Sequence, residues 1–477
     1  MRPVTTFTAL IALVSGLAVH DVGQDQAERL SHELGSTLSR PGLVSTQAPP
    51  RWSTFGAPHP AMVVNVETES DVAITVKYCA SKGIPFVAQN GGVGWAATFD
   101  LGAHGVLIDL ARLNQVTFNA DKTRATIGGG ARINETIAHA SAASALVETG
   151  NCNCVGALGA ILGGGYGNLM GLYGFGVDNV VSMRVVTADG RIRDVTAASD
   201  ADLFWALRGA GPNLGIVTSA VVKSYPVSQA GMLAWTGSLI FTPDKLEQVV
   251  QAIQDLELKP EMNIFLYFVS GGAPKNEPVI LLTPFLYGGN ATSGRAAFAS
   301  LYALGPAADS TAVLPYESWN SGGDGFCTPG GRKPSYTVAM QNLVPSTWRQ
   351  VWDKYVEFQK LPTAENSVVL MEAYSLTKAR SFGSGSAAFS HRDVNFNAVI
   401  ILWYSDVALD DRAQVVGKAA RDLWKATDGL ARDATYINFA HGDEPLEVVY
   451  GDSLSRLRDI KHRIDPKDNF NQWFNVK

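Results

Sequence analysis

The feature that most constrains this chain is a glycine-rich segment at residues 148–179, which reads ETGNCNCVGALGAILGGGYGNLMGLYGFGVDN. It contains ten glycines and only two charged side chains, Glu148 and Asp178. A surface loop would be more polar, and a linker or collagen-like repeat would not interleave leucine, isoleucine and tyrosine throughout. Glycine at this density permits positive φ and lets backbone N–H groups approach a ligand closely. The segment therefore predicts either tight backbone packing or a ligand site lined by backbone.

A second glycine-rich stretch, residues 87–95 (VAQNGGVGW), follows an expected strand. Successive N–H groups in such a turn could bind a diphosphate. Neither stretch fits the strand–GxGxxG–helix fingerprint of the dinucleotide-binding fold, and neither fits the phosphate-binding pattern GxxxxGK[ST]. Taken alone, each stretch is equally compatible with a structural role.

The first half of the chain alternates short strands and helices with glycine-rich connections. Asp189-Gly190 lies between two apolar runs within residues 185–195, a pattern that predicts a β-hairpin. Apolar runs predict strands, and helical spacing of apolar residues predicts helices. The expected strands are 62–66, 84–89, 105–110 and 124–131, and the expected helices are 70–83 and 134–145.

The pattern changes near Pro226, after which the expected strands are longer and farther apart. Long helices at 244–258 and 346–361 lie between them, which predicts an antiparallel sheet covered by helices on one side. The loop 319–334 is rich in glycine and proline and is expected to be mobile or functional. The expected strands are 232–241, 261–270, 278–287, 367–375 and 396–404.

Length and charge limit the class of protein. With 477 residues, 46% hydrophobic and 17% charged, the chain is long enough for two folding units and is not disordered in composition. The net charge of −6 and the scattered basic residues argue against a nucleic-acid partner, which would favour a basic surplus or stripe.

The compartment stays open on sequence alone. Residues 7–19 form a short apolar stretch behind Arg2, typical of a secretory signal or of a buried first helix. No other stretch approaches the roughly 20 apolar residues of a membrane span. The sequons at Asn134 and Asn290 would matter only in a secreted protein. The four cysteines are too few for a disulfide scaffold, and their spacing predicts no metal site.

Together the motifs identify a resemblance. Their order is similar to that of the berberine-bridge-enzyme-like branch of the FAD-linked oxidases, in the vanillyl-alcohol-oxidase and p-cresol-methylhydroxylase superfamily. The similarity spans most of residues 50–225 and the C-terminal end. The matching segments are 85–95, 105–114, 149–167, 176–190, 202–218, 436–438 and 450–471.

The resemblance implies an α+β fold in which a split FAD-binding domain of the PCMH type surrounds a substrate domain built on an antiparallel sheet covered by helices. The expected parts are an N-terminal segment at 1–49, the FAD-binding domain at 50–225, the substrate domain at 226–430 and a returning C-terminal segment at 431–477.

The resemblance also implies which residues contact the cofactor. The stretch from Asn90 to Gly94 would wrap the diphosphate, glycines of the 148–179 segment would line the cofactor channel, and the backbone at 215–217 would contact the flavin or the adenine. Asp178 and Asn179 would begin a supporting strand. The expected FAD-binding residues are Asn90, Gly91, Gly92, Val93, Gly94, Cys152, Gly159, Gly163, Gly164, Gly165, Gly167, Gly215, Ile216, Val217 and Asn438.

Cys152 matches the position at which relatives form a 6-S-cysteinyl bond to the flavin. A thiolate is a suitable nucleophile for an electron-poor ring, although a free cysteine can also be an inert packed thiol. Cys154 has no such match and is expected to be structural. Many relatives attach a histidine in a GGH motif to the flavin as well, but this chain has Val93 there. The expected attachment is therefore single, through Cys152.

The second departure concerns proton transfer. Relatives that oxidise alcohols carry a tyrosine base just after a Tyr-x-Asn triplet, whereas this chain has Phe439 after Tyr436-Ile437-Asn438. Phenylalanine cannot take a proton. Another side chain on the substrate sheet is expected to do so, although tyrosine or histidine on an apolar strand is more often a core residue. A carboxylate in such a strand is the more suggestive case. The leading candidates are Glu372, Tyr374 and Tyr404, followed by Tyr267 and His391.

Two functions from different classes follow. The first is an FAD-dependent oxidase of a small lipophilic organic molecule, expected to be a secondary metabolite, with oxygen as acceptor and hydrogen peroxide as product. The second is a flavin-containing cyclase or pericyclase with no net redox chemistry, which the absence of the histidine and tyrosine motivates. A third hypothesis, a flavin-binding protein without catalytic activity, is less favoured than either of these two. The expected partners are a small-molecule substrate and O2, in a monomer or homodimer.

Overall fold

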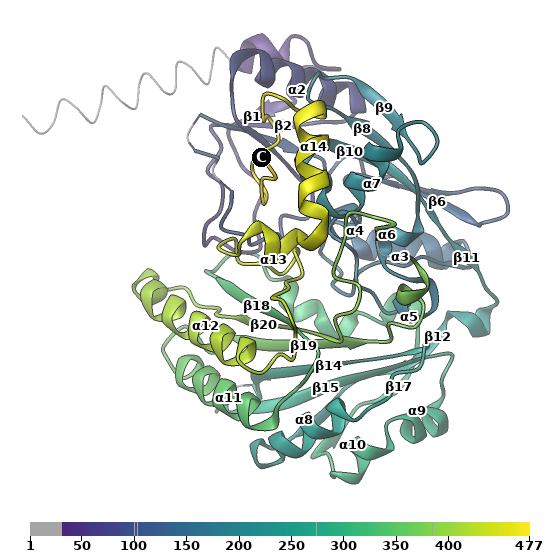
Figure 1. Ribbon diagram of the computed structural model, residues 1–477, viewed down its shortest axis with the longest axis vertical. Coiled ribbons are helices and arrows are strands. Elements are labelled where there is room, and N and C mark those ends of the chain that lie inside the picture. Colours follow the sequence, from purple (N-terminus) through teal and green to yellow (C-terminus); the bar gives the residue numbers. More distant parts are fainter. Residues whose placement is uncertain (1–30, 100, 103, 273, 384) are drawn as a thin grey trace, which may run out of the picture.

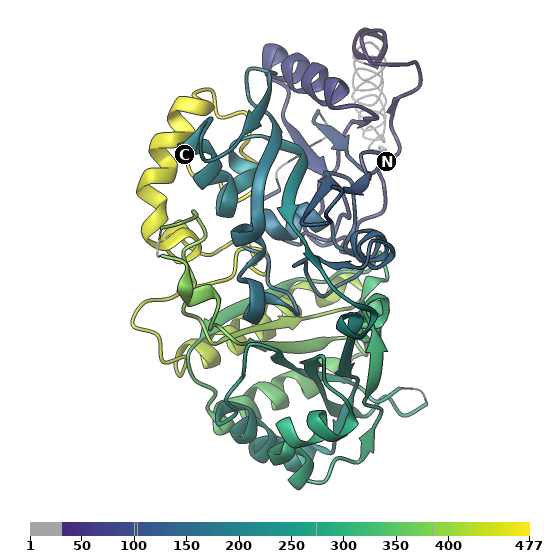
Figure 2. The same cartoon turned by 90° about the vertical axis from the view of Figure 1, so that its right-hand side faces the viewer.

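The computed structural model describes residues 31–477, apart from residues 100, 103, 273 and 384. The expected signal or first helix at 7–19 lies outside the described residues. Figure 1 and Figure 2 show two stacked halves, with the purple-to-teal first half above a broad green sheet and the yellow C-terminal helix against the first half. Among the described residues no helix is both long and apolar enough to cross a membrane.

A small, mostly parallel sheet opens the first half. Its strand order is β1-β2-β4-β3, with β2, β4 and β3 parallel and β1 antiparallel to β2. Helix α2 (Glu69–Lys82) connects β2 to β3; the Thr68 side chain accepts from Asp71 N at its start, and Gly83 ends it at φ 65°. The strands are β1 (Val44–Ser45), β2 (Met62–Asn65), β3 (Phe86–Gln89) and β4 (Val106–Asp109).

The second sheet of the first half is antiparallel, in the order β5-β6-β10-β8-β9. The expected Asp189-Gly190 hairpin is confirmed: it joins β8 to β9, and Gly190 has φ 71°. Helices α3 (Ile133–Ala142), α4 (Ala157–Leu162) and α7 (Ala201–Ala210) contribute to the same hydrophobic core as this sheet. The strands are β5 (Val116–Phe118), β6 (Arg124–Gly128), β8 (Val180–Val186), β9 (Ile192–Val195) and β10 (Ile216–Lys223).

The second half is built on a nine-stranded antiparallel sheet. Its main path runs β16-β13-β15-β14-β19-β20-β18, and β12 and β17 pair beside β15. The strands are β12 (Leu233–Thr236), β13 (Leu239–Phe241), β14 (Met262–Ser270), β15 (Pro278–Tyr287), β16 (Ala308–Asp309), β17 (Ala312–Pro315), β18 (Ser335–Met340), β19 (Val368–Tyr374) and β20 (Phe396–Ile401).

Helices cover one face of this sheet, as the sequence predicts. The longest of them are α8 (Leu246–Gln254), α11 (Pro345–Gln359) and α12 (Asp410–Lys425), as Figure 1 shows. Alternate strand residues such as Phe268 pack under them, with its ring 4.9 Å from that of Trp352. Because side chains alternate along a strand, the residues between them point to the opposite face, which meets the first half of the molecule.

The C-terminal segment returns to the first half. Helix α14 (Leu454–Ile464) forms ion pairs from Arg456 and Arg463 to Asp202 of α7. Beyond the helix, the Phe470 ring lies edge-on to Phe86 of β3 at 5.3 Å. The molecule therefore has the mixed α+β architecture expected from the sequence, and residues from both ends of the chain meet around one interior space.

Candidate active site

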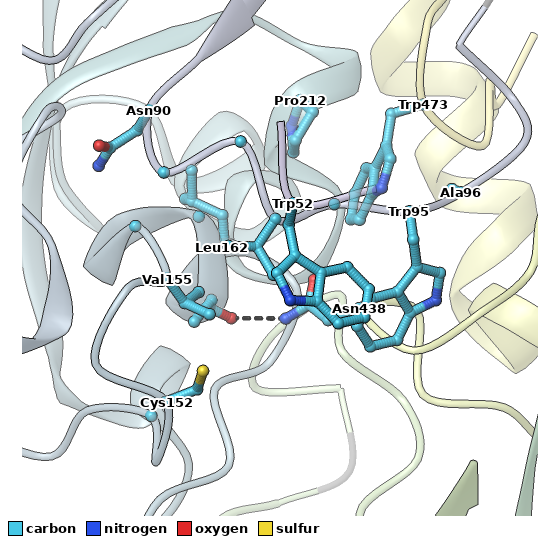
Figure 3. Close-up of a pocket in the computed structure, with 18 of the residues that line it drawn as sticks. Trp52, Asn90, Trp95, Ala96, Cys152, Val155, Leu162, Pro212, Asn438 and Trp473 are labelled. Atoms are coloured by element: carbon cyan, nitrogen blue, oxygen red, sulfur yellow. Dashed lines mark hydrogen bonds between the residues drawn. The ribbon is translucent and has the colours of Figure 1, made fainter. Parts of the chain in front are cut away.

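A cavity of about 410 Å³ lies between the two halves. Its walls come from the loop after β3, the glycine-rich segment, the start of β10, the Tyr436–Phe439 stretch, the C-terminal tail and the helix-free face of the large sheet. Figure 3 shows the tryptophans Trp52 and Trp95 on one side of the view and Cys152 with Val155 on the other. Its size is within the range of about 300–1,000 Å³ that ligand pockets occupy.

The loop from Asn90 to Gly94 lines the cavity directly after β3. Gly91 must be glycine, because a Cβ there would lie 2.5 Å from the carbonyl oxygen of Cys154. Gly92 has φ 65°, which also favours glycine. Asn90 Nδ2 donates to the carbonyls of Gly129 and Ala131 at 2.9 and 2.8 Å. The loop thus presents bare backbone to the cavity and is held from behind by side-chain hydrogen bonds.

Arg51 adds a positive charge beside this loop, and no pattern in the sequence indicates its role. Its guanidinium donates to Gln89 Oε1 at 2.6 Å and to the Gly94 carbonyl, and it lies over the Phe99 ring. Burial lowers the pKa of Arg51 to about 10, so the group stays cationic at neutral pH. The residue lies far outside the glycine motifs, and only the fold brings it to them.

The five glycines expected in the cofactor channel divide into two groups. Gly159 lines the cavity. Gly163, Gly164, Gly165 and Gly167 instead allow close packing behind it: a Cβ at Gly163 would lie 2.1 Å from Asn438 Oδ1, and one at Gly167 would lie 2.0 Å from the Thr149 carbonyl. For these four, a need for tight packing explains the glycine better than ligand contact does.

The other expected backbone contacts do reach the cavity. Gly215, Ile216 and Val217, at the start of β10, are among the lining residues, and so is Asn438. Asn438 Nδ2 donates to the Ala160 carbonyl at 2.9 Å and to the Tyr436 hydroxyl at 2.7 Å. Asp178 and Asn179 end the short helix α6 (Gly176–Asn179) immediately before β8.

Cys152 lines the cavity as a free thiol. Burial raises the pKa of this thiol to about 11, so it is protonated at neutral pH. Beside it, Cys154 forms a disulfide with Cys327, 173 residues away. The structural role expected for Cys154 is therefore a disulfide bond, and the spacing of the cysteines in the sequence does not indicate its partner.

Glu372 and Tyr374 lie on the cavity side of β19. The Tyr374 hydroxyl donates to Glu372 Oε2 at 3.0 Å and accepts from Asn151 Nδ2 at 2.6 Å. Glu372 is 8% exposed, and burial raises its pKa to about 7. A carboxyl group in this state can take or give a proton near neutral pH. Asn151, next to Cys152, joins this network and was not expected from sequence.

The remaining proton-transfer candidates are spread over the structure. Tyr267 of β14 lines the cavity. Tyr404 does not: its hydroxyl donates to Asp410 Oδ1 at 2.7 Å, and its ring packs against Phe358 of α11 on the helix-covered side. His391 lies 2.8 Å from the Val448 carbonyl, also away from the lining residues, and burial lowers its pKa.

Both positions where the sequence departs from its relatives lie at the cavity. Val93 and Phe439 line it beside Trp52 and Trp95. The Phe439 ring is 5.6 Å from that of Trp95, whose Nε1 donates to the Phe439 carbonyl at 3.0 Å. Neither Val93 nor Phe439 offers a nucleophile or a base, so this wall is apolar.

The cavity suits FAD. The Asn90–Gly94 loop supplies exposed N–H groups and Arg51 supplies positive charge, which together suit a diphosphate. Asn90 Oδ1, Asn151 Oδ1 and Gln472 Oε1 are buried without a hydrogen-bond partner in the described part of the chain, and all three residues line the cavity. Buried polar atoms of this kind normally find a partner, which a polar ligand would provide.

Comparison with known proteins agrees with this assignment. The family model described as FAD binding domain matches residues 60–196, and the model described as berberine and berberine like matches residues 435–477. The FAD-linked oxidoreductase OXR1 of Pyricularia oryzae is 34% identical over 432 residues, covering 88% of this chain and 84% of the relative. The FAD-linked oxidoreductase hasG of Aspergillus fumigatus is 33% identical, covering 87% and 91%.

Solved structures share the fold. The BBE-like 1 protein of Physcomitrella patens superposes with a TM-score of 0.80 at 20% identity, covering 94% of this chain and 99% of that one. A xylooligosaccharide oxidase from Myceliophthora thermophila gives 0.77 at 22% identity, with the same coverage of 94% and 99%. The chain is therefore an enzyme of the berberine-bridge-enzyme-like family of FAD-linked oxidoreductases.

Proposed function

We propose that this enzyme oxidises a hydroxyl-bearing, largely apolar small molecule and uses oxygen as the final electron acceptor, with hydrogen peroxide as the second product. The observation that carries this proposal is the buried pair of Glu372 and Tyr374 at the cavity, since alcohol oxidation needs a group that removes the hydroxyl proton. FAD, when bound, supplies the redox chemistry by accepting a hydride from the substrate carbon.

The chain's own residues would hold the cofactor at two ends. The Asn90–Gly94 loop and Arg51 would bind the diphosphate, and Gly215 to Val217 would contribute backbone groups farther along the cavity. Cys152 would attach the flavin covalently through Sγ. Val93 has no nucleophilic atom, so the attachment would be single. The lining position of Cys152 and the family match of its motif support this assignment.

Glu372 would act as the base. With a pKa of about 7, roughly half of this group is carboxylate at neutral pH, and each carboxylate can accept the substrate hydroxyl proton. Tyr374 orients it by donating to Oε2, and Asn151 in turn orients Tyr374. Burial raises the pKa of Tyr374 well above its usual value, so Tyr374 acts as a donor and not as the base.

The substrate region is apolar and aromatic. Val368 and Leu370 of β19 share the cavity face with Glu372, and the ring of Tyr267 stacks on Phe326 at 5.6 Å. Such walls favour a flat lipophilic molecule, for example an aromatic secondary metabolite, over a carbohydrate, which needs many polar partners. The polar groups of the region are concentrated at the Glu372 network, where a single hydroxyl would be recognised.

The test is anaerobic mixing of the holoenzyme with a panel of aromatic alcohols, phenols and oligosaccharides, followed by absorbance of the flavin. We expect an aromatic alcohol to bleach the flavin, and readmission of oxygen to restore the colour with one equivalent of peroxide. Bleaching by oligosaccharides alone would contradict the substrate class. Bleaching without peroxide on reoxidation would contradict oxygen as the acceptor.

A redox-neutral cyclase is the second candidate, and one observation favours it. Val93 and Phe439, which replace the histidine and tyrosine of many relatives, together form an apolar wall of the cavity. In that case Glu372 would donate or remove a proton to promote ring closure. The same experiment separates the two functions, because a cyclase would convert its substrate without bleaching the flavin and without peroxide.

A further inference from the structure

Three cysteine sulfurs meet at the edge of the cavity. Cys154 and Cys327 are bonded to each other, and Cys152 Sγ lies 3.7 Å from Cys154 Sγ and 3.8 Å from Cys327 Sγ. Cys152 is the residue that the proposed function assigns to the flavin. The thiol that would attach the cofactor is thus in contact with a disulfide.

This disulfide joins the two halves of the molecule across the cavity. Cys152 and Cys154 lie in a turn of the first half, in which Val155 N donates to the Cys152 carbonyl at 3.1 Å. Cys327 ends the 3-10 helix Ser321–Cys327 of the second half. Its neighbour Phe326 lines the cavity and accepts a hydrogen bond from Trp52 Nε1 at 2.5 Å. The disulfide therefore links the two halves covalently and also holds in place the part of the cavity wall that Phe326 forms.

Thiol–disulfide exchange among these sulfurs needs no external oxidant. The Cys152 thiolate attacks Cys327 Sγ, a Cys152–Cys327 bond forms, the Cys154–Cys327 bond breaks, and Cys154 leaves as a thiolate that takes up a proton. One disulfide and one thiol are present before and after the exchange. Because Cys152 Sγ is about equally far from both sulfurs, it lies beside their bond, and its side chain must rotate to attack in line.

We propose that the Cys154–Cys327 disulfide prevents Cys327 from forming a disulfide with Cys152, and so keeps the Cys152 thiol available for attachment to the flavin. Cys327 is held in a bond to Cys154, which leaves Cys152 free to attach to FAD, while exchange of Cys152 into the disulfide gives a second isomer that cannot attach it. This proposal rests on the proposed covalent link through Cys152 and adds a control on it. Burial raises the pKa of Cys152 and keeps the thiol protonated at neutral pH, which slows this exchange.

The test compares two variants that lose the same disulfide. In Cys154→Ser, Cys327 is released next to Cys152; in Cys154→Ser/Cys327→Ser, the disulfide is lost and no other cysteine remains beside Cys152. The full-length proteins are incubated with FAD and with oxidised glutathione, which accepts the two electrons when a new disulfide forms. Flavin that stays with acid-precipitated protein is measured, and disulfides are mapped by mass spectrometry of a non-reduced digest.

We expect Cys154→Ser to retain ~10-fold less attached flavin than the wild type and to yield a Cys152–Cys327 peptide. The double variant should regain attachment to near the wild-type amount. The proposal would be overturned if Cys154→Ser retained as much attached flavin as the wild type, or if no Cys152–Cys327 peptide were found. Equal loss of attachment in both variants would also overturn it, because the tether and not the capture of Cys152 would then be responsible.

Failure of the underlying link gives a different result. If the wild-type protein itself releases all its flavin on precipitation, the covalent attachment is wrong. In that case the peptide map of Cys154→Ser still decides whether Cys327 captures Cys152.

Discussion

The Tyr374 hydroxyl donates a hydrogen bond to Glu372 Oε2 over 3.0 Å, between two residues that are two positions apart on β19 and share its cavity face. Because Tyr374 is a donor, its hydrogen bond favours the charged form of Glu372, while burial favours the neutral form and dominates. The balance raises the pKa of Glu372 to about 7. This carboxyl group can therefore change its charge within the physiological pH range.

Glu372→Gln should lower the rate of anaerobic flavin reduction by about 10²–10⁴-fold, because the glutamine amide cannot accept the substrate proton. In the wild type, only the carboxylate is active, so the rate should rise with pH through about 7 and then level off. The variant should lose this dependence. Stopped-flow absorbance over a pH series measures both effects.

Tyr404→Phe is the matched control, because Tyr404 lies just beyond β20 of the large sheet and its hydroxyl donates to Asp410 away from the cavity. It should reduce the flavin at the wild-type rate. A wild-type rate and pH profile in Glu372→Gln would remove Glu372 from the reaction.

The same carboxyl group should make stability depend on pH. Its pKa is about 7 in the folded chain against 4.5 normally, so its stabilising contribution is complete below 4.5 and is lost as pH rises to 7. At 1.36 kcal/mol per pKa unit, the loss is about 3 kcal/mol. Glu372→Gln should therefore raise the melting temperature relative to wild type more at pH 8 than at pH 4.5. An equal difference at both pH values would show that the carboxyl group does not titrate in this range.

Much of the architecture could be predicted from local patterns. The Asp189-Gly190 turn and the helical spacing at 70–83 depend on neighbouring residues only, and both features form as expected. A role for Glu372 could be predicted for a similar reason, since a carboxylate in an apolar strand is costly to bury and needs a compensating role. The structure brings it to the cavity.

Which face of a strand meets the cavity could not be predicted. Ala398, Ile400 and Tyr404 are separated by even numbers of residues, and all three pack under the helices. Glu372 points to the opposite face and lines the cavity. The choice depends on strand register, which pairs Met371 with Ala398 and so places both on the helix side. Register between distant strands is a property of the whole sheet.

Contacts over long sequence distances were equally inaccessible. The Cys154–Cys327 disulfide spans 173 residues, and nothing in the local sequence of either cysteine indicates the other. Arg51 reaches the Asn90–Gly94 loop because the chain before β2 lies beside that loop, where Trp52 N donates to the Gly92 carbonyl at 3.0 Å. Each of these depends on how separate elements pack together.

A buried ion pair at the end of the glycine-rich segment should be important for stability. Arg392 donates through both terminal nitrogens to Asp178 at 2.9 and 2.8 Å, and the Asp178 and Arg392 side chains are 1% and 6% exposed. Asp178→Ala leaves the guanidinium buried without its partner, which typically costs about 3–5 kcal/mol. The midpoint of urea unfolding measures this loss.

Asp452→Ala is the control for this pair, because it breaks an ion pair with Arg432 whose side chains are 80% and 78% exposed. Such surface pairs contribute little, so its midpoint should match that of the wild type. If Asp178→Ala unfolds at the same urea concentration as Asp452→Ala, the buried pair does not stabilise the fold.

Cys152→Ala should release all the yellow colour into the supernatant on acid precipitation, because Val93 offers no nucleophile for a second attachment. The burial that raises the pKa of Cys152 to about 11 also predicts the pH dependence of attachment. The thiolate fraction grows ~10-fold per pH unit below that value, so attachment of FAD added to protein that was produced without flavin should accelerate steeply between pH 7 and 9. A pH-independent rate would mean that proton loss from Cys152 does not limit the reaction.

Val93→His should allow a second attachment. Val93 lines the cavity in the loop after β3 and is only partly buried, so we expect the cavity to accept an imidazole at this position. Its ring nitrogen would provide the nucleophile that valine lacks. Tandem mass spectrometry of a digest should then show one flavin carrying both the Val93→His peptide and the Cys152 peptide.

Val93→Ala is the matched control, because it changes the same position without adding a nucleophile, and it should show flavin on the Cys152 peptide alone. Val93→His combined with Cys152→Ala should retain flavin through the histidine. If Val93→His shows flavin only on the Cys152 peptide after long incubation with excess FAD, the loop does not bring position 93 to the flavin ring.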